Sequence, residues 1–118
     1  MSAILTDVKK HISGISEDNT DFDSDILMWV NGAFSKITRV GAGPEAGFRV
    51  TESTSWEDFP GDVKMISAIQ NFVTLDVKIA FDSTTLPSFV LTTMEKQRDE
   101  YLWTINNYAD YWPASGGT

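Results

Sequence analysis

Residues 21–40, DFDSDILMWVNGAFSKITRV, form the stretch that decides the fold. Apolar side chains recur in it at steps of three and four, which places them along one stripe of an α-helix. The stripe consists of Phe22, Ile26, Leu27, Val30, Ala33, Phe34, Ile37 and Val40. Residues 14–21 just before it are rich in Ser, Asp, Asn and Thr, which cap helix N-termini and complement the helix dipole. We therefore predict a core-facing helix over residues 21–40.

Three further helices are predicted on the same grounds. Residues 3–13 carry apolar side chains at helical spacing, and Gly14 follows them as a helix-terminating residue. A third helix opens at Asp62 and is apolar on nearly all sides, so we expect it at the centre of the bundle or beneath another subunit. A fourth helix begins near Pro87, which suits a first turn, and runs to about Tyr108 with a charged face. Its apolar stripe is broadened by Phe89, Leu102 and Trp103.

The second and third predicted helices are separated by residues 41–61, where helical periodicity is absent. Glycines and Pro44 at the start of this segment cannot continue a helix. Residues 48–51 alternate β-prone side chains and predict a short extended arm or loose hairpin, while Ser55 and Asp58 have the spacing of a capping box. Because connections of this length in small domains are usually functional or mobile, we expect the chain to leave the core here as a projecting arm.

The expected fold class is all-α, a small four-helix bundle with a long, partly extended loop between its second and third helices. Residues 1–108 form the helical domain, with the arm at 41–61, and residues 109–118 form a flexible C-terminal tail without periodicity. The tail contains Tyr111 and Trp112. Two large aromatic side chains in such a segment predict an anchor for another protein.

Composition narrows the class of function. The 118 residues suffice for one core, and 9 basic against 17 acidic residues give a formal net charge of −8. This charge disfavours binding to nucleic acid or anionic membranes through a basic face. The chain has no cysteine, which excludes disulfides and thiolate metal sites. It also shows no signal peptide and no run near the ~20 apolar residues of a membrane span, so we expect a soluble chain that is not exported.

A calcium site is the first chemical possibility to test. Asp21, Asp23 and Asp25 have the spacing with which a calcium-binding loop begins. Such a loop requires glycine at its sixth position and glutamate at its twelfth, where this sequence has Ile26 and Gly32. Helix capping therefore explains these carboxylates, and no metal is expected.

Other catalytic or cofactor-binding patterns fail for equally local reasons. The glycine-rich segment 41–47 follows a helix instead of preceding one. It also contains no lysine and includes Pro44, so it does not fit a phosphate-binding loop. His11, the only histidine, is interpreted as a partly exposed helix residue. Neighbouring carboxylates such as Glu57 and Asp58 point in different directions and do not converge on a substrate. We expect no enzyme and no cofactor.

Three passages carry a family resemblance when taken together. Residues 5–33 contain a short helix, an acidic turn and the start of a second helix. Residues 59–69, FPGDVKMISAI, place a proline, an aspartate and a lysine at the start of the central helix. Residues 88–106 contain SFVL and EKQRDEYLWTIN. In this order the passages resemble the small head-to-tail connector (adaptor) proteins of tailed bacteriophages, also labelled head-completion or DNA-packaging proteins.

The sequence departs from this family at two places. Residues 78–81, which end the central helix, lack the tyrosine and arginine common there. Leu102 and Thr104 replace the glutamate and arginine that often flank Trp103 in the family. These differences concern how the fourth helix contacts its neighbours.

The resemblance implies a viral structural protein of the virion neck, made in the host cytoplasm. Members of the family form a homo-oligomeric ring, commonly a dodecamer, beneath the portal protein. The ring extends the channel through which DNA passes without specific binding, and it provides the platform for the stopper or tail-completion protein. No membrane is involved.

Candidate contact residues for these partners come from the predicted arm and tail. They are Phe48, Arg49, Val50, Trp56, Tyr111 and Trp112. An alternative function of a different class is a monomeric acidic helical module that binds or regulates another protein.

Overall fold

The computed structural model describes residues 3–12, 15–16, 18–44, 46–61 and 63–109, and the structural statements below concern these residues. The chain forms the helices α1 (Ile4–Lys9), α2 (Asp23–Arg39), the short 3-10 helix η1 (Trp56–Asp58), α3 (Val63–Asp82) and α4 (Ser88–Ala109). No β-strand occurs in the described ranges, where the only extended pairing is an isolated bridge between Ala3 and Ser55. The predicted all-α, four-helix fold is confirmed.

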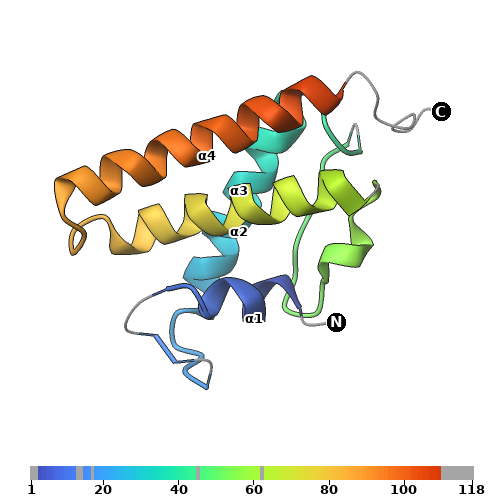
Figure 1. The fold of residues 1–118 in the computed structure, drawn as a ribbon. Helices are drawn as coiled ribbons and strands as arrows, with labels where there is room; N and C mark the ends of the chain where they lie inside the picture. The colour runs from blue at the N-terminus through green and yellow to red at the C-terminus, as the bar shows by residue number, and fades with distance from the viewer. Residues whose placement is uncertain (1–2, 13–14, 17, 45, 62, 110–118) are drawn as a thin grey trace.

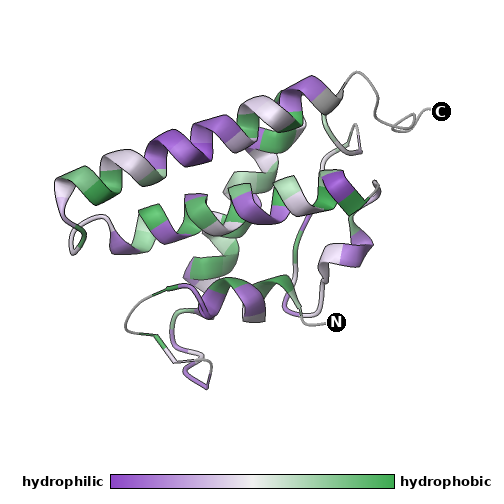
Figure 2. Cartoon of the chain, in the orientation of Figure 1, coloured by the Kyte–Doolittle hydropathy of each residue, from purple (hydrophilic) through white to green (hydrophobic). Residues whose placement is uncertain are grey.

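Helix α3 lies at the centre of the arrangement. It runs antiparallel to α4, with which it makes the most extensive contact, and it also packs against α2, α1 and η1 (Figure 1). Figure 2 shows that the middle of α4 is largely hydrophilic. The central position of α3 explains why its sequence is apolar on more than one face.

Helix α1 is shorter than the predicted range 3–13. After Lys10 the hydrogen bonds span only three residues: the His11 N–H donates to the Val8 carbonyl and the Ile12 N–H to the Lys9 carbonyl. The Lys9 side chain is buried, and its Nζ donates to the Asp23 carboxylate at 2.8 Å and to a loop carbonyl at 2.7 Å. Lys9 thereby holds the connection that leads into α2.

Helix α2 ends as the glycine after it predicts. The Gly41 N–H donates to the Thr38 carbonyl at 3.0 Å, and the Ala42 N–H donates to the Ile37 carbonyl at 3.2 Å. Gly41 has φ 90°, a left-handed conformation that costs glycine little. Together these features form a Schellman motif, which satisfies carbonyls at the helix end and turns the chain back.

Residues 41–61 pack on the body of the molecule, so the expectation of a projecting arm is not what the structure shows. Val50, Trp56 and Phe59 are buried in the core, and Phe48 packs against it. Phe34 of α2 lies with its ring centroid 5.0 Å from that of Phe48 and 5.5 Å from that of Phe59. The aromatic residues of the segment therefore complete the core over one face of α2.

A single side chain on α2 fixes the extended part of this segment. Nδ2 of Asn31 donates to the Val50 carbonyl at 3.0 Å, and its Oδ1 accepts the Val50 N–H at 2.7 Å. The amide side chain thus does for Val50 what a neighbouring strand would do in a sheet. Further along, the Ile4 N–H donates to the Thr54 carbonyl at 2.9 Å. The predicted capping box of Ser55 and Asp58 is present.

A buried carboxylate connects the three long helices. Both oxygens of Asp76 on α3 accept hydrogen bonds from Lys36 Nζ of α2 at 3.0 Å. Arg98 Nη1 of α4 lies 3.5 Å from Asp76 Oδ1. Because Asp76 is buried and both cations are partly exposed, the carboxylate is neutralised while the cations keep contact with water.

Candidate functional site: interaction surfaces

The residues singled out for metal or acid–base chemistry form no reaction centre. Asp23 is paired with Lys9, and Asp21 and Asp25 are exposed around the first turn of α2. His11 is exposed beyond α1, and its Nδ1 contacts the Asp7 carbonyl at 3.0 Å. Within the described residues no group of three or more His, Asp or Glu side chains is arranged to hold a metal ion. None of the helices there combines the length and hydropathy that a membrane span requires.

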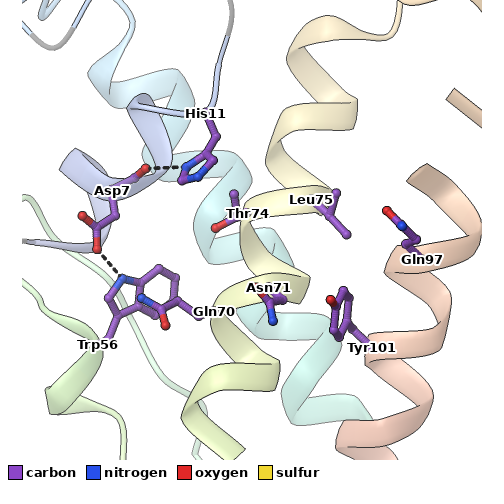
Figure 3. A pocket seen from close by; sticks show the side chains of 9 residues that line it. All are labelled: Asp7, His11, Trp56, Gln70, Asn71, Thr74, Leu75, Gln97 and Tyr101. Atoms are coloured by element: carbon purple, nitrogen blue, oxygen red, sulfur yellow. Dashed lines mark hydrogen bonds between the residues drawn. The ribbon is translucent and has the colours of Figure 1, made fainter. Parts of the chain in front are cut away.

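One hollow lies between α1, η1, α3 and α4, and has a volume of about 350 Å³ (Figure 3). Its walls come from Asp7, His11, Trp56, Gln70, Asn71, Thr74, Leu75, Gln97 and Tyr101. In Figure 3, Gln97 and Tyr101 approach from α4, whereas Asp7 and His11 approach from the region of α1. Asp7 accepts the Trp56 Nε1–H at 2.8 Å, which fixes the buried indole at the edge of the hollow.

Two further hollows continue this one along the same face of α3. The first, of about 470 Å³, includes Ile66, Ser67 and Gln70 together with Trp56 and Phe59. The second, of about 440 Å³, is lined by Val63, Lys64, Ser67, Ala68, Asn71, Tyr101 and Thr104. Neighbouring hollows share lining residues, so we treat the three as one surface feature. We call it the α3 groove and define it by Val63, Ile66, Ser67, Gln70, Asn71 and Tyr101.

The opposite flank of α4 carries a separate apolar surface. Trp103 is 66% exposed and stands beside Val40, Leu102, Asp99 and Asn106, which surround a shallow hollow of about 270 Å³. We call this surface the Trp103 flank. At 100° per residue, Trp103 and Asn106 lie about half a turn from Tyr101 and Thr104, which line the α3 groove. The buried residues Met94 and Ile105 lie between these two surfaces on the helix.

Other exposed apolar side chains lie elsewhere on the molecule. Phe22, Met28 and Trp29 are exposed around the first half of α2, and Phe89 is exposed at the start of α4. These residues line none of the hollows described above.

The structure separates the residues predicted as partner contacts. Arg49 is exposed, and with Phe48 it lines a hollow of about 350 Å³ against α2. Val50 and Trp56 are buried in this chain, so their side chains do not present surface to a partner. The remaining two candidates, Tyr111 and Trp112, lie outside the described residues.

The sequence reasoning missed the Trp103 flank because it counted Trp103 among residues that broaden the buried stripe of the fourth helix. The signal was present, since Trp103 is out of phase with Met94, Tyr101 and Ile105. A large apolar side chain out of phase with the buried stripe of its own helix indicates a surface contact.

Comparison with known proteins supplies the remaining information. The sequence matches the family described as phage connector protein over residues 4–112. No curated protein and no solved structure gives a significant match. The matched region spans all four helices of the bundle. The chain belongs to the phage connector protein family.

Proposed function

We propose that the protein is a non-enzymatic subunit of the virion neck, an adaptor that forms a ring beneath the portal and presents a platform for the stopper or tail. Membership of the phage connector family carries this proposal, because that family is structural. The ring, its copy number of about twelve and the identity of its neighbours follow the family resemblance. The exposed surfaces on both flanks of α4 support the assembly of several copies.

The charge of the chain fits a role around DNA that moves. A formal charge of −8 gives phosphates few attractive contacts. In the proposed ring, DNA passes through the channel without being held.

We assign the contact with the portal to the C-terminal segment, residues 109–118. We assign the contact with the stopper or the phage tail to the surface around Phe48 and Arg49. Trp112 and Tyr111 are the large aromatic residues beyond α4, and aromatic side chains are the commonest anchors of protein interfaces. Arg49 is exposed beside Phe48, and a planar guanidinium suits bidentate contact with a partner carboxylate.

Co-sedimentation with the portal protein of the same phage tests the proposal. We expect the wild-type chain to sediment with portal assemblies and to appear as an added ring by electron microscopy. Trp112→Ala, or truncation after Asp110, is expected to reduce binding at least tenfold while helicity is unchanged. The truncation leaves all four helices in place.

The matched control is Trp29→Ala, which removes an exposed indole from α2. It is expected to sediment as the wild type does. A wild-type chain that stays monomeric and never sediments with portal would refute the adaptor role and favour a monomeric binding module. Wild-type portal binding by Trp112→Ala and by the truncated chain would refute the C-terminal segment as the anchor.

A second experiment tests the contact between the ring and the stopper or phage tail. Arg49→Glu is expected to leave portal binding intact and to reduce tail joining in phage assembled with the variant. Thr51→Glu, an exposed change in the same segment, is the control. Equal infectivity of the two variants would refute the assignment of Arg49.

A further inference from the structure

We propose that the α3 groove of one subunit receives the Trp103 flank of the next subunit, so that neighbouring copies join through two different faces. This inference rests on the proposed function, since it names the contact between subunits of the ring. It concerns the residues of α3 and α4 that the core of a single chain leaves uncovered.

The placement of the two surfaces is the first argument. Tyr101 and Thr104 line the groove, whereas Trp103 and Asn106 line the hollow on the other side of α4. A contact between unlike faces is heterologous, and its repetition gives a ring when the rotation between neighbouring subunits closes. A contact between like faces would stop at a dimer.

The shapes and chemistry of the two faces agree. The groove is concave and offers the apolar side chains of Val63, 85% exposed, and Ile66, together with the amides of Gln70 and Asn71. Trp103 is a projecting side chain with a large apolar surface and one N–H donor. An indole buried in this groove gains apolar contact, and its N–H finds an amide oxygen as acceptor.

The two faces carry opposite charges at Lys64 and Asp99, which favours their contact even though copies of this acidic chain repel one another. Lys64 is exposed at the end of the groove and forms no ion pair with the described residues. Asp99 is 69% exposed beside Trp103 on the opposite flank, and its Oδ1 lies 3.2 Å from Arg98 Nε of the same chain. Docking of the two faces brings this lysine toward the neighbour's Asp99, which offsets part of the repulsion between copies of charge −8.

Cysteine cross-linking on portal-bound rings tests the contact, because the chain has no cysteine of its own. Ser67→Cys labels the groove and Asn106→Cys labels the Trp103 flank, and both positions are exposed. We expect a short bis-maleimide to link an equal mixture of these variants at least tenfold more than either variant alone. Ser24→Cys mixed with Ser67→Cys is the control and should remain unlinked.

The results distinguish the contact from the function. If portal-bound rings form but the mixture is not linked, or each variant links to itself as strongly, the contact is refuted and the adaptor role stands. If no ring forms on the portal at any concentration, both are refuted.

Substitution provides a second measurement. Trp103→Ala is expected to weaken ring assembly on the portal at least tenfold, with unchanged far-ultraviolet circular dichroism. Phe89→Ala removes another exposed aromatic residue of α4, away from the proposed contact, and is expected to assemble normally. Equal assembly of the two variants would overturn the proposal, and the cross-linking experiment decides the matter independently should either variant fold poorly.

Discussion

The sequence predicts Trp56 as a contact with a partner protein, whereas the structure buries it in the core. Replacing Trp56 by alanine distinguishes these two roles. Trp56 is 1% exposed, and its ring centroid lies 6.3 Å from that of Phe34. Burial of an indole removes roughly 150–250 Å² from water, which at ~25 cal/mol per Å² corresponds to about 4–6 kcal/mol. Measured Trp→Ala changes in cores cost about 3–5 kcal/mol.

The lost hydrogen bond adds little to this cost. Asp7, the acceptor of the Trp56 Nε1–H, has a side chain that is 25% exposed, so water can replace the indole. The groove beside Trp56 also lets solvent enter the cavity that the substitution leaves. We therefore expect Trp56→Ala to lower the free energy of unfolding by about 4 kcal/mol, a large part of the ~6–18 kcal/mol typical of a domain this size.

Urea denaturation followed by circular dichroism measures the effect. With an m-value near 2 kcal/mol per M, the midpoint should fall by about 2 M. Trp56→Phe keeps an aromatic ring but loses the N–H and should cost about 1–2 kcal/mol. The matched control Trp103→Ala removes an exposed indole and should change stability by less than about 1 kcal/mol. A Trp56→Ala variant with the wild-type midpoint but weaker portal binding would refute the assignment to the core.

Three further substitutions test local features of the fold. Gly43→Ala should destabilise the protein by about 2–4 kcal/mol in urea titrations, because Gly43 has φ 81° and a Cβ there would lie 2.5 Å from the Phe59 ring; an unchanged midpoint would contradict this. Asn31→Ala should lower the free energy of unfolding by about 2–4 kcal/mol and raise the hydrogen-exchange rate of the Val50 amide. An unchanged exchange rate in the variant would disprove that the Asn31 side chain holds Val50 against α2. Asp76→Asn should cost about 1–3 kcal/mol, because two cations lose their shared carboxylate, and equal stability of variant and wild type in low salt would show that the ion pairs contribute nothing.

The long helices could be predicted from the sequence because their apolar residues repeat with the period of the structure that forms. Helix α2 begins at Asp23 and ends at Arg39, inside the predicted range 21–40. The end of α2 was predictable from Gly41, because the left-handed conformation that ends the helix there depends only on neighbouring residues. The end of α1 was placed too late, because its last turn tightens into three-residue hydrogen bonds that periodicity does not register.

The course of residues 41–61 could not be predicted because the groups that hold it are distant in sequence. Asn31 reaches Val50 across nineteen positions, and an asparagine on a helix gives no local sign of such a partner. Similarly, nothing local to Phe48 and Phe59 shows that both rings pack against Phe34 of α2 and against each other. The groove involves α3, α4 and η1 together, so no single stretch of sequence contained it.

The attachment of α1 has a consequence for the order in which the molecule folds. Six residues are too few for a helix to persist alone, since isolated helices shorter than ~12–15 residues are marginal in water. The ties of this helix reach far along the chain: Ile4 bonds to Thr54, and the carbonyl of His11 accepts from Lys78. Contacts of such sequence separation form late, after the loops between them have closed. Helix α1 thus leaves the ribosome before α2, α3 and α4, and its contacts form only after residues made much later have been added.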